Sequence, residues 1–212
     1  MTMLAAVTNP TPLKKSPFNF TEAMRLLCED ICIRLPDFQH VKMDKVAVTF
    51  AQARRRVPYG LQAKLTPLRF EGGQLTTHRK GRKWTIQRWY SGNVEVLYIL
   101  TFYLPRFLEQ SYREKLITVM HELYHINPNF DGDTRRLPGH YHVHSHSQKD
   151  FDCQMDMLVD QYLSLNPSAD LINFLLGSFR DLCARYGHVV GIRVPIPKLL
   201  PLSKSRRSKK RR

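Results

Sequence analysis

The sequence predicts an α+β fold in which a small antiparallel sheet packs against a central helix and further helices. Segments that resemble strands are concentrated in residues 41–103. Before that region, in residues 21–35, apolar residues recur at helical spacing, and they do so again in residues 106–126 and from about 147 to 186. Short turn sequences that contain glycine separate neighbouring strand segments, which favours antiparallel pairing.

Four segments of the strand region have the alternation or the β-branched and aromatic residues typical of strands. They are residues 46–50, 60–70, 84–89 and 94–100, and Pro67 interrupts the second. The last is the most apolar, and we expect it to be the most buried. Proline disfavours helical backbone at the residue before it, so Pro36 ends the first helix and Pro128 ends the second. Asn166 and Pro167 interrupt the third helical region.

The expected organisation is one folded domain between two tails. Residues 1–17 are predicted to be a disordered N-terminal tail, residues 18–190 the domain, and the Pro-rich, basic residues 191–212 a disordered C-terminal tail. Hydrophobic residues make up 42% of the chain, which suffices for a packed core. We see no apolar run of about 20 residues and no signal peptide. The four cysteines include no C-x-x-C pair. These features predict a cytoplasmic protein without membrane contact.

The chain is strongly basic, with 33 Lys and Arg against 18 Asp and Glu and a net charge of +15. Such an excess points first to nucleic acid as a partner. Two segments carry much of this excess of positive charge. Residues 54–88 hold ten Lys or Arg, and residues 204–212 hold seven. A solvated surface and a charged tail explain the same composition, because charge alone does not identify a partner.

The residues His121-Glu122-Leu123-Tyr124-His125 form an H-E-x-x-H motif on the second predicted helix. Two histidines four residues apart lie on one helix face, so both imidazoles can reach one zinc ion. Glu122 lies beside that face, where it can accept a proton from a zinc-activated water without being a ligand. The motif therefore predicts a zinc hydrolase with Glu122 as the base.

A catalytic zinc usually has three protein ligands, so one more is needed. No Glu follows Glu122 in the sequence, and the extended motif with a third His fails, because Pro128 and Asp131 replace its Gly and His. The remaining candidates are histidines at alternate positions, namely His140, His142, His144 and His146. His146 is preferred because it directly precedes a helix, which holds a ligand more rigidly than a loop does, and His144 is second.

The motif, followed by His146-Ser147-Gln148-Lys149-Asp150-Phe151, resembles the short zincin metallopeptidases. These include the SprT-like proteins and the putative metallopeptidases of bacteria and phages. The resemblance covers about residues 40–165, in the sheet region only in outline. It implies a minimal zincin-like fold, zinc bound by His121, His125 and His146, Glu122 as the base, and a protein or peptide substrate. SprT-like proteins are associated with DNA, which is compatible with the basic segments here.

Two other functions are compatible with the same residues. One is a nucleic-acid-associated protein with a structural zinc ion, and the other is a zinc hydrolase that acts on a substrate other than a peptide. Glu122 favours catalysis, because a structural site does not need a base. The helix after His146 carries Asp152, Asp156 and Asp160 on one face. One of these could orient a ligating histidine, although a solvated acidic face is the simpler interpretation for at least two.

Overall fold

The computed structural model describes residues 16–53, 60–136 and 148–202, with the backbone alone for residues 148–152. Helices and several small sheets are combined, which confirms the α+β class. The central sheet has three strands in the order β2-β8-β3, formed by β2 (Val46–Gln52), β8 (Tyr98–Leu104) and β3 (Ala63–Pro67). The middle strand, β8, is the most apolar and is largely buried.

The predicted antiparallel sheet is wrong for one pair of strands. β3 is antiparallel to β8, but β2 runs parallel to it, with Val46 opposite Tyr98 and Gln52 opposite Leu104. Turn sequences constrain only strands that follow one another directly. The long connection between β2 and β8 lets the chain cross over and enter the sheet in the same direction.

Two antiparallel hairpins are present, and the turn of the second, at Gly92, is a predicted one, whereas the turn of the first, at Lys80 and Gly81, was not predicted. One consists of β4 (Thr76–Arg79) and β5 (Arg82–Ile86), and the other of β6 (Trp89–Ser91) and β7 (Val94–Val96). The predicted strand 94–100 is divided between β7 and β8, because the Leu97 N–H donates to the Lys45 carbonyl instead of continuing the hairpin. Within the first hairpin, Lys80 and Gly81 both have positive φ, of 49° and 71°, as tight two-residue hairpin turns require.

The predicted C-terminal tail is wrong for residues 191–202. β10 (Leu199–Leu202) pairs antiparallel with β5 to give the sheet order β10-β5-β4. Upstream, the buried Val194 donates its N–H to the Thr49 hydroxyl, which itself donates to the Ile192 carbonyl. Prolines are compatible with edge strands, where a missing N–H breaks no ladder, and Pro201 lies in the edge strand β10. Residues 203–212 and 1–15 lie outside the described ranges.

The chain also enters the domain as a strand. β1 (Phe18–Asn19) pairs parallel with β9 (Val189–Val190), so the start of the domain and its last helical region lie together. α1 (Phe20–Arg34) follows directly, and the Asn19 side chain caps it by accepting a hydrogen bond from the Glu22 N–H. Short 3-10 helices precede or interrupt the strands, at η1 (Pro36–Phe38), η2 (Met43–Lys45) and η3 (Glu71–Gly73).

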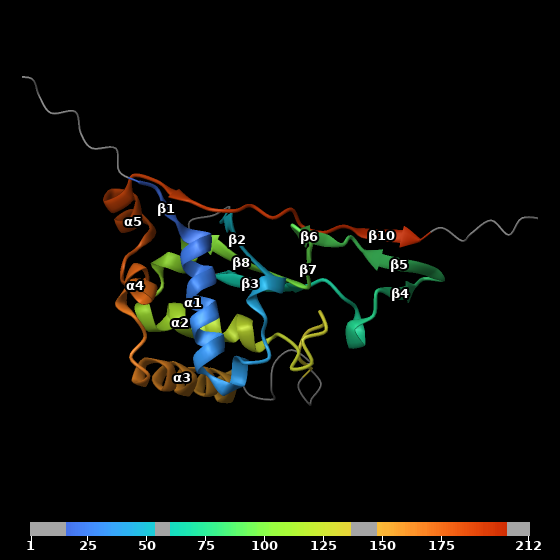
Figure 1. Ribbon diagram of the computed structural model, residues 1–212, viewed down its shortest axis with the longest axis horizontal. Coiled ribbons are helices and arrows are strands. Elements are labelled where there is room, and N and C mark those ends of the chain that lie inside the picture. Colours follow the sequence, from blue (N-terminus) through green and yellow to red (C-terminus); the bar gives the residue numbers. More distant parts are fainter. Residues whose placement is uncertain (1–15, 54–59, 137–147, 203–212) are drawn as a thin grey trace, which may run out of the picture.

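The remaining helices follow β8. They are η4 (Arg106–Glu109), α2 (Tyr112–Tyr124), α3 (Gln148–Ser164), α4 (Ala169–Ile172), η5 (Asn173–Leu176) and α5 (Phe179–Tyr186). In Figure 1, α4 and α5 lie at one end of the molecule and the β4–β5–β10 sheet at the other. No described helix is long and apolar enough to cross a membrane.

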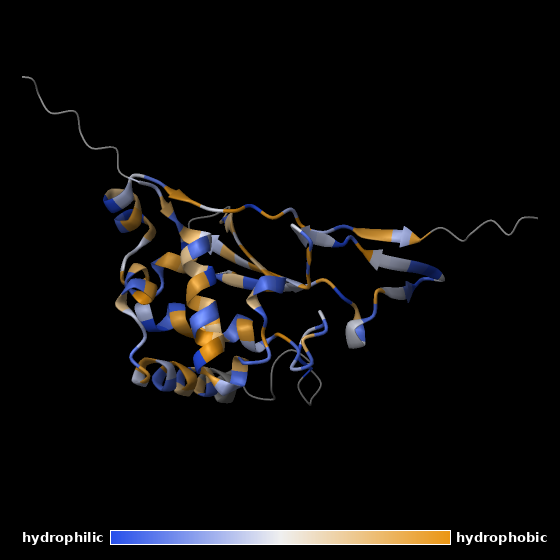
Figure 2. Ribbon diagram, in the orientation of Figure 1, coloured by the Kyte–Doolittle hydropathy of each residue, from blue (hydrophilic) through white to orange (hydrophobic). Residues whose placement is uncertain are grey.

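The core lies between the central sheet and the helices α1, α2 and α3, which contribute buried apolar residues to it. Figure 2 shows hydrophobic and hydrophilic residues interspersed along these helices. Phe20 of α1 makes edge-to-face contacts with Phe102 of β8 and with Phe107, with ring centres 5.9 and 6.1 Å apart. Lys115 of α2 is buried, and its ammonium donates to the Leu175 and Gly177 carbonyls, at 2.8 Å each. These contacts fix the position and rotation of α2.

Candidate metal centre

The helix α2 carries the motif histidines at its C-terminal end. Its start is defined by a capping box, in which Ser111 and Glu114 each accept a hydrogen bond from the backbone N–H of the other. Its apolar face is fully buried through Leu116, Val119, Met120 and Leu123. Because both ends and one face are fixed, the direction of the opposite face is fixed as well.

His121 and His125 lie one turn apart on that helix end. Their ring centres are 4.6 Å apart and the rings are nearly perpendicular, at 78°. The His125 side chain is largely enclosed, with 9% of the residue exposed, and His121 is half-buried. Two imidazoles this close can both bind one zinc ion at the usual Zn–N distance of about 2.0–2.1 Å. This is the arrangement that the motif predicts.

Glu122 makes a contact that the sequence did not reveal. Its carboxylate accepts a hydrogen bond of 2.6 Å from the backbone N–H of Leu65, which lies in β3. Burial raises the pKa of Glu122 to about 7, against the lowering effects of this hydrogen bond and of the Lys64 ammonium. A carboxyl group with a pKa close to neutral is well suited to accept and return a proton at neutral pH.

The hydrogen bond from Leu65 identifies β3 as part of the site. Among the described strands, β3 pairs on one side only, with β8. Its other edge faces α2, and there the Leu65 N–H donates to Glu122 and not to another strand. The proposed base therefore lies at an open edge of the central sheet.

The loop after the motif is fixed by buried polar groups. Asp133 is 4% exposed, and its carboxylate accepts from the Gly72 N–H, the Thr134 N–H and the Arg136 guanidinium. The buried Tyr98 hydroxyl accepts from the Gly132 N–H and donates to the Asp133 carbonyl. Sequence reasoning missed both anchors, because nothing in the spacing of residues 131–133 distinguishes a buried carboxylate from an exposed turn.

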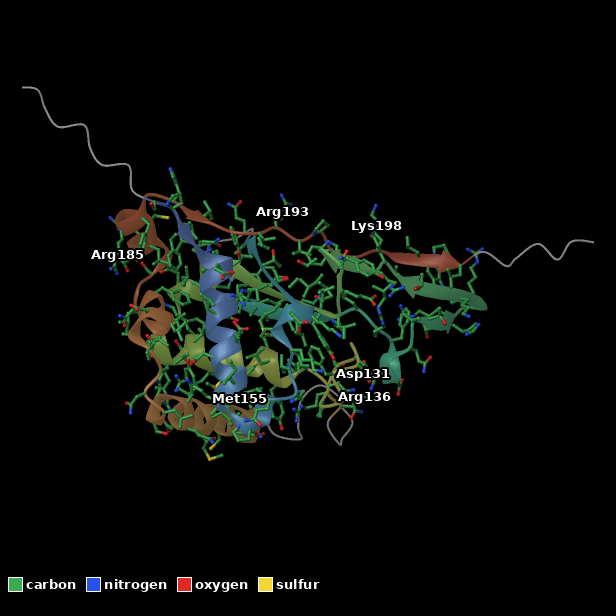
Figure 3. All side chains as sticks on the ribbon, viewed as in Figure 1. Asp131, Arg136, Met155, Arg185, Arg193 and Lys198 are labelled. Atoms are coloured by element: carbon green, nitrogen blue, oxygen red, sulfur yellow. The ribbon has the colours of Figure 1, made fainter. Side chains whose placement is uncertain are left out.

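A cleft of about 470 Å³ lies beside this loop. Its lining includes Asn127, Asp131 and Arg136, and Figure 3 shows the last two close together on the loop. Arg135 also lines the cleft, and its guanidinium lies 3.9 Å from the centre of the Tyr124 ring, within the motif. The cleft is thus continuous with the motif end of α2.

The helix α3 runs antiparallel to α2. Arg113, in the first turn of α2, forms ion pairs of 2.6 and 2.8 Å with Asp156 and Asp160 of α3. Near the other end of α2, the Tyr124 hydroxyl accepts a hydrogen bond from the Gln154 amide. The first turn of α3 therefore points toward the motif. Asp156 and Asp160 pair with Arg113 and do not orient a motif histidine, while the Asp152 side chain lies outside the described part.

The third ligand cannot be assigned from the described residues. His140, His142, His144 and His146 all lie within residues 137–147, which the structure does not describe. Among the residues whose side chains are described, no group of three His, Cys, Asp or Glu is placed to hold a metal ion. Two of the three predicted zinc ligands, His121 and His125, are brought together, and the preferred third one, His146, remains a prediction.

Comparisons with protein-family models, curated proteins and solved structures gave no match. The function must therefore be argued from this chain alone. The relevant features are the histidine pair, the half-buried Glu122 and the edge of β3 beside them.

Proposed function

We propose that the protein is a zinc-dependent metallopeptidase that hydrolyses a peptide bond with a metal-activated water. The proposal rests on the positions of three side chains, those of His121, His125 and Glu122. His121 and His125 lie side by side, with their ring centres 4.6 Å apart. Glu122, which lies between them in the sequence, accepts a hydrogen bond from the Leu65 N–H at the edge of β3. The resemblance of the motif and its flanking residues to short zincin metallopeptidases agrees with this proposal.

The two described histidines of the motif, His121 and His125, are suited to bind a zinc ion. Neutral imidazole is a preferred zinc ligand, and both rings come from a helix that buried contacts hold rigidly. A bound zinc ion would lower the pKa of a water molecule to about 7 and polarise the substrate carbonyl. Glu122 would accept a proton from the attacking water and later donate it to the leaving amine nitrogen, so that the base ends the cycle unchanged.

The open edge of β3 supports a peptide as the substrate. An extended peptide can add to a free sheet edge through backbone hydrogen bonds, whatever its side chains are. Along β3 such a peptide would bond to the groups of this edge other than the Leu65 N–H, which already donates to the Glu122 carboxylate at 2.6 Å. The sheet edge would thereby place a peptide bond beside the base. A substrate without an extended backbone would not use this edge.

The direction of α3 supports His146 as the third ligand. The Gln154 side chain contacts Tyr124 of the motif, and α3 begins at Gln148, closer still in sequence to His146. A histidine just before this helix would enter from the motif end of α2.

The free cysteines of the described chain are compatible with the proposed cytoplasmic location, since Cys28 and Cys32 are buried as thiols.

Zinc content and casein cleavage test the proposal on untagged protein purified without added metal. We expect about one zinc per chain, and Glu122→Gln should retain it while the cleavage rate falls about 10³-fold. Glu109→Gln, at an exposed glutamate near the start of α2, is the matched control and should cleave normally. In the same zinc titration, His146→Ala should weaken binding more than His140→Ala. A zinc-free protein that takes up no zinc, or full activity in Glu122→Gln, would contradict the proposal.

A further inference from the structure

The β4–β5 hairpin is an exposed basic ribbon at the end of the molecule away from α4 and α5 (Figure 1). All six residues from His78 to Lys83 are exposed, and they include four Lys or Arg. No Asp or Glu occurs between residues 76 and 88. Figure 2 shows this tip as hydrophilic, next to the apolar β10.

The register of the hairpin places cations on both of its faces. Arg79 is paired with Arg82, and His78 with Lys83. Neighbouring pairs along a ladder point to opposite faces, so the two arginines lie on one face and Lys83 on the other. Lys80 occupies the turn, where the space around Gly81 is open. The tip is therefore positively charged on each side and at its end.

These cations differ from the paired arginines of helices α1 and α2. Arg25, Arg34 and Arg113 each form an ion pair with a carboxylate on the same or a neighbouring helix. For Arg79, Lys80, Arg82 and Lys83 there is no ion pair with any described residue. Uncompensated charge on a rigid, exposed element favours an anionic partner over a structural role.

The pairing of β10 brings the end of the described chain to the same place. Leu202 lies opposite Lys83, so the described chain ends beside the hairpin tip. The seven Lys and Arg of residues 204–212 follow directly in the sequence. Among the described residues, Arg79 and Arg82 lie one pair beyond the last residue of β10 that pairs, Leu202, so the ribbon is two strands wide from there to its turn.

We propose that the hairpin tip, residues 78–83, binds double-stranded DNA by entering the major groove. That groove is about 12 Å wide and admits a two-stranded ribbon, whereas the major groove of an RNA duplex is too narrow. Cations on both faces can contact the phosphates of both groove walls. A single strand would lie along one face and would need several aromatics on which successive bases stack, whereas β5 carries one, Trp84.

Fluorescence anisotropy with the full-length protein and a short DNA duplex, across a salt series, tests the proposal. Arg79→Gln with Arg82→Gln should weaken binding at least about tenfold at low salt and should reduce the salt slope by up to about 1.8, from about 0.9 per phosphate contact. The matched control is Arg180→Gln with Arg185→Gln, two exposed arginines of α5 at the other end of the molecule, where Figure 3 labels Arg185. The control should bind like the parent.

Two results would overturn the proposal. The first is a hairpin variant with unchanged affinity and salt slope, or one that loses no more than the α5 control. The second is tighter binding of single-stranded DNA or of an RNA duplex than of the DNA duplex. Far-UV circular dichroism of each variant separates loss of binding from loss of fold. Since the hairpin is remote from α2, this outcome is independent of zinc content and casein cleavage.

Discussion

The motif helix α2 and the basic β4–β5–β10 sheet are held in place in different ways. α2 is fixed by fully buried residues on one face and by the buried Lys115, which donates to two backbone carbonyls. The basic sheet is held mainly by backbone pairing, and the four residues of β10 are all exposed. Reacting groups need the precise positions that buried side-chain contacts provide. Contact with a polyanion needs only exposed cations, and strands held by backbone pairing can present these.

The two regions also differ in how far apart in sequence their parts lie. The motif histidines are four residues apart, so helix geometry alone brings them together. The basic sheet joins residues 82–86 to residues 199–202, and no local rule predicts that pairing. The largest stability effects should therefore come from buried groups around α2, and the smallest from the edge of the basic sheet.

The largest loss of stability is expected from a substitution in the loop after the motif. Asp133→Ala would leave the Gly72 and Thr134 N–H groups and the Arg136 guanidinium without their buried acceptor. We expect the free energy of unfolding to fall by about 3 kcal/mol, in the range for breaking a buried polar network. Urea denaturation measures it. Asp170→Ala, at an exposed carboxylate, is the control and should change by about 0.5 kcal/mol or less. Equal losses in both would show that the loop is not anchored as described.

In zinc-free protein, substitution of Glu122 is expected to change the free energy of unfolding by a smaller amount and to raise it. Its pKa is raised from 4.5 to about 7 by burial, so the folded state favours the protonated carboxyl. Ionisation therefore costs stability as the pH rises from about 4.5 to 7, and the cost is complete above that range. Glu122→Gln removes it and should stabilise the protein by about 2 kcal/mol near pH 8 but hardly at all near pH 4. Urea denaturation in the presence of a chelator at both pH values checks this, and a gain independent of pH would point to a cause other than ionisation.

The difference between the regions also explains what could be predicted from the sequence. The α+β class, the end of α1 before Pro36 and the histidine pair follow from local periodicity and local geometry. The predicted helix 106–126 is wrong at both ends, because η4 is separate from α2 and α2 already ends at Tyr124, before Pro128. The parallel pairing of β2 with β8 and the bond from Leu65 to Glu122 join segments far apart in the chain. The periodicity of one segment carries no information about which distant segment it pairs with, so these features became visible only in the fold.

The smallest change in stability is expected at the end of the chain, where composition alone predicted a disordered tail from residue 191 onward. A chain that ends at Ser203 keeps all of β10, and we expect its free energy of unfolding to change by less than about 0.5 kcal/mol. A chain that ends at Lys198 loses the pairing of Leu199–Leu202 with β5. It should lose about 1 kcal/mol, because the lost strand is short and its three leucines, Leu199, Leu200 and Leu202, remain 40% exposed. Urea denaturation of both truncated chains beside the full chain measures the difference. If ending at Lys198 costs nothing, β10 adds no stability to the sheet, and its pairing matters only for placing the basic residues that follow it.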